Sequence, residues 1–312
     1  MTLTAPEPGA TVVVETPASS ANLGPGFDSI GLALGVWDTC RVTVLDGPGV
    51  EVTVEGEGAD GVPRDASHLV IRTMMRTWAE LDVEPPRGLR LESVNAVPHG
   101  RGMGSSATAI VTGIVAAQAL CANVCGDVGS FDATFTNDLA ARLEGHPDNA
   151  SASVFGGATL SWADDPAVGT TTVRLPVHED VVAVVFAPET QLSTARARAV
   201  LPAHVRLADA AANSGRAALL AHALANEPDH LVAATRDWLH QEPRRASYAA
   251  SMDLVDALRA SDLAAVISGA GPSVLALVRT ARVREAQAFC PVGWRVLTPG
   301  IPGSGVRVSL AP

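Results

Sequence analysis

The residues best suited to chemistry lie in one short stretch, PHGRGMGSSATA, at residues 98–109. A strand followed by a glycine-rich turn and a helix directs unpaired backbone N–H groups and the positive end of the helix toward one point. Glycines let the backbone approach a phosphate without interference from a Cβ, and Ser106 offers a hydroxyl for Mg²⁺ or a phosphate oxygen. The stretch therefore predicts an anion-binding loop.

The loop does not identify a phosphate site by itself, because an ordinary glycine-rich turn with Ser105 as the helix cap fits it equally well. The dinucleotide fingerprint fails, since serine stands where its third glycine is required, and the loop contains no G-x-S-x-G nucleophile elbow. The chain also contains no lysine. P-loop NTPases, protein kinases and pyridoxal enzymes each need one, so all three classes are excluded.

Charge and termini narrow the class of protein further. The formal net charge is −11, which argues against a nucleic-acid or membrane-surface partner, because both kinds of binding need basic patches. The first ten residues, MTLTAPEPGA, lack the basic and apolar regions of a secretory signal, so we expect a cytoplasmic protein. A phosphate ligand must therefore be held by local features of a globular chain.

The cysteines and histidines do not form a metal-binding pattern. The cysteines at 40, 121, 125 and 290 have no C-x-x-C spacing, and we interpret Cys121 and Cys125 as small apolar side chains on a buried helix. His68, His99 and His146 lack a second histidine at ligand spacing. We interpret His146 as a packing residue in a turn.

Periodicity predicts the elements that must position the glycine loop. Alternation predicts strands at 11–16, 41–45, 51–56 and 88–94, and amphipathic patterns predict helices at 68–81 and 131–144. The uncharged run 107–125 contains threonines, a glutamine and an asparagine, so a buried core helix fits it better than a membrane span. The glycine loop thus joins a strand to the central helix of a domain.

The second half of the chain has a different pattern. Short β runs follow Gly156, then alanine-rich helices, the strands AAVIS and SVLALV, a helix near 282–289 and two closing strands. This order suggests an α+β second domain. We place the boundary near Asp165, which divides the chain into domains at 1–165 and 166–312.

Three separated motifs resemble the GHMP kinase family, named after galactokinase, homoserine kinase, mevalonate kinase and phosphomevalonate kinase. They are PASSANLGPGFDSIGLAL at 17–34, PHGRGMGSSATA at 98–109 and ISGAGPSVLAL at 267–277. EGHPDNASASVFGG at 144–157 and LSTARARAVLP at 192–202 resemble the homoserine kinases of that family. The resemblance implies a two-domain α+β fold: an N-terminal α/β domain like domain 2 of ribosomal protein S5, and a C-terminal ferredoxin-like domain.

The resemblance implies ATP and Mg²⁺ as cofactors. It assigns the nucleotide phosphates to the second motif, namely Pro98, His99, Gly100, Arg101, Gly102, Met103, Gly104, Ser105 and Ser106. It assigns Mg²⁺ to Ser106 and to an acidic residue, for which Glu144 is our choice and Asp138 the alternative. The third-motif residues Gly269, Ala270, Gly271, Pro272 and Ser273 are expected to form a loop against the phosphate loop.

The substrate end is assigned by resemblance to the first motif, where Asn22 and Asp28 bind the amino and hydroxyl groups of homoserine. Read without the resemblance, NLGPGFD is a tight turn. A zwitterionic substrate also needs a cationic fork for its carboxylate, which arginine supplies. Arg198, with Thr194 beside it, and Arg245 match the family's carboxylate-binding residues, and Arg196 and Arg244 are the neighbouring alternatives.

The implied reaction is transfer of the ATP γ-phosphoryl group to the homoserine side-chain hydroxyl. Because such transfers have loose transition states, positioning and charge neutralisation supply most of the catalysis. Asn149 is expected to orient the hydroxyl while Asp28 or solvent accepts the proton. The alternatives are a kinase of the same family for another small alcohol, or a silent metabolite sensor. The sequence does not determine the oligomeric state, and a homodimer is one candidate assembly.

Overall fold

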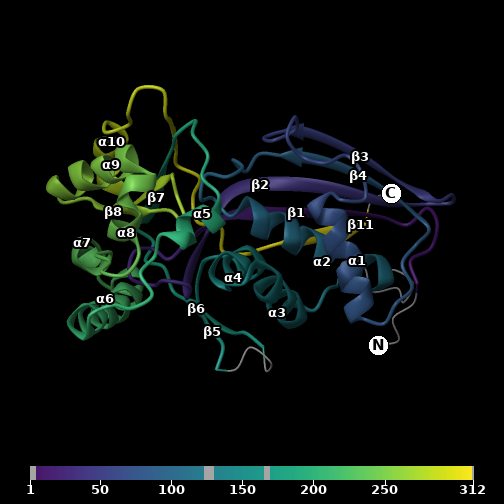
Figure 1. Ribbon diagram of the computed structural model, residues 1–312, viewed down its shortest axis with the longest axis horizontal. Helices are drawn as coiled ribbons and strands as arrows, with labels where there is room; N and C mark the ends of the chain where they lie inside the picture. Colours follow the sequence, from purple (N-terminus) through teal and green to yellow (C-terminus); the bar gives the residue numbers. More distant parts are fainter. Residues whose placement is uncertain (1–4, 123–129, 165–168, 311–312) are drawn as a thin grey trace.

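The computed structural model of the chain describes residues 5–122, 130–164 and 169–310. The molecule is elongated and has two lobes, each built on its own β-sheet (Figure 1). Cys125 and Asp165, used in the sequence predictions, lie outside the described residues. The two sheets correspond to the mixed two-domain architecture that the sequence predicts.

The larger sheet has seven strands. In order along it run β11, β1, β2, β4 and β3, and β5 pairs with both β2 and β6. The strands are β1 (Thr11–Ala21), β2 (Ile30–Leu45), β3 (Gly49–Gly56), β4 (Gly88–Asn95), β5 (Ala158–Trp162), β6 (Thr171–Leu175) and β11 (Arg307–Leu310). The β3–β4 pair is parallel, and the other pairs in this sheet are antiparallel.

The strand β2 is much longer than the sequence predicts. Alternation marked only residues 41–45, whereas the strand begins at Ile30. Residues 30–34 are buried on both sides, so the strand shows a continuous apolar run there instead of an alternating one. The β1–β2 pairing extends over the same residues, with a register shift between Pro17 and Ala18. This extension carries the first motif into the space between the lobes.

Four helices cover one face of the larger sheet (Figure 1). They are α1 (Leu69–Glu80), α2 (Ser105–Ala122), α3 (Ala133–Glu144) and α4 (Asp148–Phe155). The helix α2 is apolar on all sides and central to the core, as the uncharged run predicts. In the described part of the chain, no helix is both long enough and apolar enough to cross a membrane.

Local sequence explains how the helices near the site begin and end. Asp132 caps α3 by accepting the N–H groups of Thr134 and Phe135, at 2.8 and 3.0 Å. Gly145 ends the same helix in the left-handed conformation. The α4 helix then starts at Asp148, directly after the turn that contains His146. The abrupt end of α3 brings Glu144 and the residues after it to the inner edge of the lobe.

The smaller sheet runs β10–β7–β9–β8 and is antiparallel throughout. Its strands are β7 (Val181–Ala187), β8 (Ala264–Ile267), β9 (Val274–Arg279) and β10 (Arg295–Leu297). The helices of this half are α5 (Thr194–Ala199), α6 (Leu207–Ala225), α7 (Leu231–Ala234), α8 (Gln241–Arg244), α9 (Ala249–Ala260) and α10 (Val283–Gln287). Short 3₁₀ helices occupy Pro228–His230, Arg245–Ser247 and Thr280–Arg282.

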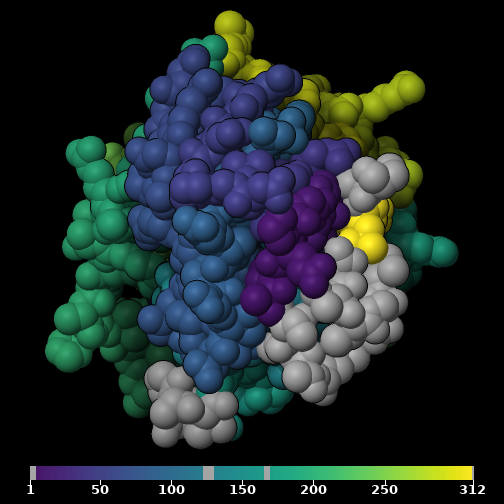
Figure 2. Space-filling model, turned by 90° about the vertical axis from the view of Figure 1, so that its right-hand side faces the viewer, coloured from purple at the N-terminus to yellow at the C-terminus, as the bar shows by residue number. Residues whose placement is uncertain are grey.

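The chain returns to the first lobe at its end. Of the two closing strands that the sequence predicts, β10 joins the smaller sheet and β11 pairs with β1 in the larger one. Figure 2 looks onto the end of the larger lobe, which is formed mainly by the first hundred residues, coloured purple to blue. The first strand is thus held between partners from both ends of the sequence.

A shared apolar cluster joins the two lobes. It contains Leu23, Leu32 and Met103 from the larger lobe and Val185, Leu220 and Leu275 from the smaller one, all fully or almost fully buried. Burial of this cluster fixes the lobes against each other, because apolar surface removed from water stabilises at about 25 cal/mol per Å². The loops above this cluster, from both lobes, form the site.

Candidate active site

The glycine loop lies against the third motif. Gly102 has a φ of +73°, and a Cβ there would lie 2.2 Å from the carbonyl oxygen of Ser268. Ser268 Oγ donates a hydrogen bond to the Gly102 carbonyl at 2.5 Å, and the N–H of Ser273 donates to the Arg101 carbonyl at 3.2 Å. A side chain at Gly102 would separate the two loops, so glycine is required there.

The residues of this loop divide into two groups. Gly100, Gly102, Gly104, Ser105 and Ser106 line a cavity of about 240 Å³ between the lobes. Pro98, Arg101 and Met103 do not line it: Met103 is buried in the core, and Arg101 donates to the carbonyls of Pro188 and Glu189. Of the third motif, Gly269, Ala270 and Gly271 line the cavity, whereas Pro272 and Ser273 do not.

The first motif forms the turn between β1 and β2. Asn22, Leu23 and Asp28 all have positive φ angles, which shows how tightly this turn is wound. The Asn22 amide accepts the N–H of Asp28 at 3.0 Å and donates to the Gly269 carbonyl at 3.1 Å. Asn22 therefore holds the turn closed and ties it to the third motif, while it also lines the cavity.

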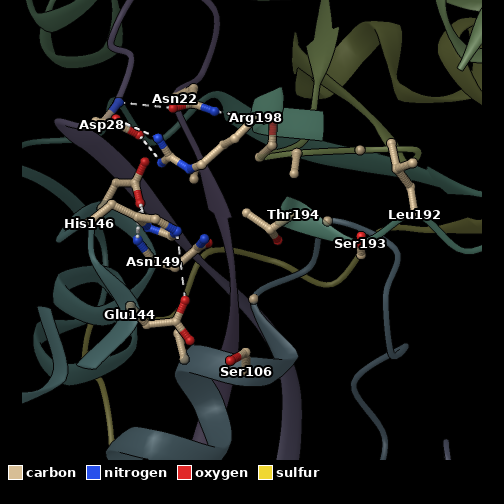
Figure 3. A pocket seen from close by; sticks show the side chains of 18 of the residues that line it. Asn22, Asp28, Ser106, Glu144, His146, Asn149, Leu192, Ser193, Thr194 and Arg198 are labelled. Carbon is tan, nitrogen blue, oxygen red and sulfur yellow. Dashed lines mark hydrogen bonds and ion pairs between the residues drawn. The ribbon is translucent and has the colours of Figure 1, made fainter. Parts of the chain in front are cut away.

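Asp28 forms an ion pair with Arg198 across the cavity (Figure 3). The two guanidinium nitrogens lie 3.1 and 2.5 Å from the two carboxylate oxygens, a bidentate geometry. The hydrogen bonds that Arg198 donates to the Asp28 carboxylate raise the pKa of Arg198. Arg198 comes from α5, whose cap Ser193 accepts the N–H of Arg196 at 3.2 Å. The side chain of Arg196 is exposed and does not line the cavity.

The second arginine of the cavity is Arg244. Its guanidinium is almost completely buried, donates from Nε to the Ala197 carbonyl at 2.9 Å and lines the cavity. The sequence-based choice, Arg245, lies outside and pairs with Glu242 and Asp256 at 2.7 and 3.0 Å. Adjacent helical residues point about 100° apart, so only one of the two can face the cavity. The structure brings Arg198 and Arg244 together, and leaves Arg245 on the surface.

The segment after α3 supplies the acidic wall. Glu144 Oε1 is buried without a hydrogen-bond partner, and its other oxygen lies 3.7 Å from Nε2 of His146. Asp138, the alternative to Glu144, does not line the cavity; it accepts the N–H of Thr170 and pairs with Arg142 at 3.2 Å. Figure 3 shows Glu144 and Ser106 at the same end of the cavity, opposite Asp28 and Arg198.

His146 lines the cavity, whereas its sequence context predicts only a packing residue in a turn. Its Nδ1 lies 2.9 Å from the Asp148 carboxylate, and the side chain is buried in the cavity wall. Burial lowers the pKa of His146, but the hydrogen bond to Asp148 and the charges of Asp148 and Glu144 outweigh it and raise the pKa above its ordinary value. Its position two residues before the D-N pair was the signal available in the sequence.

Asn149 lies between the two ends of the cavity (Figure 3). Its Oδ1 accepts a hydrogen bond from Ser19 Oγ at 3.1 Å, and its backbone N–H donates to Asp148 at 2.8 Å. These bonds leave the side-chain NH₂ as the end that can meet a ligand. Thr194 and Phe27 complete the wall beside Arg198.

A second cavity of about 290 Å³ lies on the other side of the glycine loop. Both cavities are lined by Gly100, Ser105 and Ser106. Its wall is mainly apolar, with Val62, Pro63, Leu69, Val70 and Ala109, and its polar groups include Asn95, His68 and His99. Burial lowers the pKa of both histidines, so they are neutral at pH 7. A flat apolar group joined to a phosphate would fit across the two cavities.

Comparison with known proteins identifies the family of the chain. The family model for the GHMP kinases N terminal domain matches residues 68–157, and the model for the GHMP kinases C terminal matches residues 208–291. The chain belongs to the GHMP kinase family. The curated relatives include the homoserine kinase of Streptomyces avermitilis, 46% identical over 96% of both chains, and that of Cutibacterium acnes, 47% identical over 86% of this chain and 88% of the relative. Within the family, the chain therefore groups with the homoserine kinases.

Solved structures of this family have the same fold as this chain. The homoserine kinase from Cytophaga hutchinsonii matches with a TM-score of 0.83 and 26% identity, over 96% of this chain and 97% of that chain. The mevalonate diphosphate decarboxylase from Staphylococcus aureus matches with a TM-score of 0.66 and 16% identity, over 96% and 98% of the two chains. The second likeness extends only to the fold, which serves more than one chemistry.

Proposed function

We propose that this protein is a homoserine kinase, which transfers the γ-phosphoryl group of ATP to the side-chain hydroxyl of L-homoserine. The products are O-phospho-L-homoserine, an intermediate on the way to threonine, and ADP. One observation carries the proposal: a single cavity has Asp28, Arg198 and Arg244 at one end and a phosphate-type helix start with Glu144 at the other. The chain is 46% identical to a homoserine kinase over 96% of its length, which supports the same substrate.

The substrate end fits a zwitterion. In this structure, Asp28 and Arg198 form an ion pair and neutralise each other in the cavity. A bound amino acid would replace this ion pair with two others. Its ammonium group would pair with Asp28, and its carboxylate would pair with Arg198. Arg244 adds a second cation for the carboxylate from the neighbouring wall. Exchange of one ion pair for two leaves neither Asp28 nor Arg198 without an oppositely charged partner, which avoids the cost of breaking their ion pair.

The nucleotide end uses both cavities. The backbone N–H groups at the start of α2 bind the phosphates, as expected for an exposed helix N-terminus. The apolar second cavity takes the adenine ring, and the shared residues Gly100, Ser105 and Ser106 lie where the phosphates connect the two. Both lobes thus contribute to the ATP site through the second and third motifs.

Glu144 and Ser106 are the residues that would hold Mg²⁺. The partnerless buried Glu144 oxygen fits this role, because a carboxylate left unsatisfied in a cavity wall is costly without a cation. In residues 5–122, 130–164 and 169–310 there is no group of three or more histidine, cysteine or acidic side chains that could hold a metal alone. Phosphate oxygens would complete the ligands of the ion, and the ion would neutralise part of their charge.

Asn149 orients the reacting hydroxyl. Ser19 fixes the amide through Oδ1, so the NH₂ group is directed to the substrate oxygen. With Asp28 bound to the substrate ammonium group, the Nε2 of His146, whose Nδ1 is held by Asp148, is the cavity group that can accept the hydroxyl proton. Proton acceptance can be late, because the transition state is loose. Positioning is then the main contribution of this wall.

The test is ADP release from MgATP with L-homoserine, L-threonine, L-serine, mevalonate, shikimate and galactose as acceptors. We expect turnover with L-homoserine at least about 100-fold above the others, because in this panel only homoserine combines a zwitterionic head for Asp28 and the two arginines with a hydroxyl on Cγ, one carbon farther out than in serine and threonine. Preferred turnover on another alcohol would make the protein a kinase of the same family with a different substrate. MgATP binding without turnover on any acceptor would make it a sensor.

A further inference from the structure

We propose that His240 is a positioning residue. Its imidazole bonds to both Arg244 and the turn that carries Asp28, and so fixes the position of Arg244 relative to that turn. The inference rests on the proposed function, in which Arg244 binds the substrate carboxylate. His240 itself does not line the cavity, so its effect must pass through the two groups that it joins.

The hydrogen bonds of His240 define its tautomer. Nε2 lies 2.8 Å from the Gly24 carbonyl oxygen, which can only accept, so Nε2 carries the proton. Nδ1 lies 3.3 Å from Nη1 of Arg244, which can only donate, so Nδ1 is the acceptor. The side chain is fully buried. Burial lowers the pKa of His240 and, with the charge of Arg244, outweighs the charge of Asp237 and the Gly24 hydrogen bond, which raise it, so the neutral imidazole is favoured.

The Gly24 end of this bridge belongs to the substrate-binding turn. Gly24 has a φ of +90°, and a Cβ there would lie 2.3 Å from the carbonyl oxygen of Thr235. The next carbonyl, of Pro25, accepts a hydrogen bond from Asn213 Nδ2 at 2.9 Å. The turn that carries Asp28 is therefore pressed onto the second lobe, and His240 is the side chain that joins it to Arg244.

Phe27 gives the bridge a second contact. The His240 and Phe27 rings stack with centroids 5.0 Å apart and an interplanar angle of 22°. The guanidinium groups of Arg244 and Arg198 lie 5.5 and 5.6 Å from the Phe27 centroid. His240 thus supports the aromatic ring against which both substrate-binding arginines rest.

Asp237 holds the histidine itself in place. Its carboxylate accepts the N–H groups of Leu239, His240 and Gln241 at 2.9, 3.0 and 2.8 Å, which fixes the start of α8. It lies 3.6 Å from Nε2 of His240, as the nearest anion. Without the imidazole, Arg244 keeps only its Nε bond to Ala197 on this side and can turn away from the carboxylate position.

The test compares His240→Asn and His240→Gln with His222→Gln, a change at an exposed histidine of α6. Asparagine can place an amide oxygen near the Nδ1 position, and glutamine can reach the Nε2 position. We expect His240→Gln to raise the KM for L-homoserine about tenfold or more, because Arg244 loses its acceptor, with the KM for ATP within about twofold. His240→Asn is expected to restore part of the loss, and His222→Gln to behave as the wild type.

A double-mutant cycle with Arg244→Gln separates positioning from general destabilisation. If His240 acts through Arg244, His240→Gln has little further effect on kcat/KM for homoserine once Arg244 is replaced. Discrimination between L-homoserine and 3-aminopropan-1-ol, which lacks the carboxylate, must also shrink in His240→Gln. Additive effects, or equal losses in the KM values for ATP and homoserine, would overturn the inference. Failure of the wild type to phosphorylate homoserine would refute the proposed function instead.

Discussion

Replacement of Arg244 by glutamine is the sharpest test of the substrate site, because its neighbour Arg245 offers a matched control. Arg244 is buried in the cavity wall, whereas Arg245 pairs with Glu242 and Asp256 at the surface. The two substitutions are chemically identical and one residue apart. We expect Arg244→Gln to impair homoserine use and Arg245→Gln to leave it unchanged.

The size of the effect follows from the bonds lost. A hydrogen bond to a charged group contributes about 1.5–3 kcal/mol. Each 1.36 kcal/mol corresponds to a tenfold change, so kcat/KM for L-homoserine should fall by about 10- to 150-fold in Arg244→Gln. Most of the loss should lie in KM, since Arg244 is remote from the reacting hydroxyl. Arg245→Gln removes exposed ion pairs, which contribute about 0–1 kcal/mol to stability and nothing to binding.

The assay is steady-state ADP release at varied homoserine and saturating MgATP, with the thermal unfolding midpoint of each variant measured in parallel. Arg244 Nε also satisfies the buried Ala197 carbonyl, so a moderate loss of stability is expected for Arg244→Gln and not for Arg245→Gln. The assignment is refuted if Arg244→Gln, still folded at the assay temperature, keeps kcat/KM within threefold of the wild type. Equal losses in both variants would also refute it.

Three further predictions concern the metal-binding residue, the second cavity and the buried carboxyl group of Asp38. Glu144→Gln should lower kcat about 100-fold and raise the Mg²⁺ concentration that gives half-maximal rate, and an unchanged Mg²⁺ requirement would remove Glu144 from the metal site. Ala109→Phe should fill part of the second cavity and raise the KM for ATP about tenfold with the KM for homoserine unchanged, whereas the reverse pattern would move the adenine elsewhere. Asp38 accepts the N–H groups of Ala96 and Val97, yet burial raises its pKa from 3.8 to about 6. Because the pKa of Asp38 is higher in the folded state than in the unfolded one, the protonated carboxyl group stabilises the fold. This stabilisation is complete below about pH 4 and is lost as the pH rises through about 6. The unfolding free energy of the wild type should fall over that range by about 3 kcal/mol relative to Asp38→Asn, and denaturant titrations with parallel pH profiles for the two proteins would contradict it.

The sequence by itself determined the elements whose signal is local. The amphipathic pattern located α1 to within a residue at each end, and the uncharged run identified α2 as a core helix. The spacing of the glycines in the second motif indicated an anion site, because a glycine-rich turn before a helix has the same geometry wherever it occurs. The separated motifs also identified the family, and with it the two-lobed architecture.

The tertiary structure decided what depends on which side of an element faces inward. Arg244 lines the cavity and Arg245 does not, because one residue of helical rotation decides which way a side chain points. Glu144 lines the cavity from the last residue of α3, whereas Asp138, six residues earlier, pairs with Arg142. The structure also shows that His146 lines the cavity wall, and that His240 bonds to Gly24, which is 216 residues away in the chain. Such contacts leave no periodic trace in the sequence, since they form only when the two lobes close on their shared core.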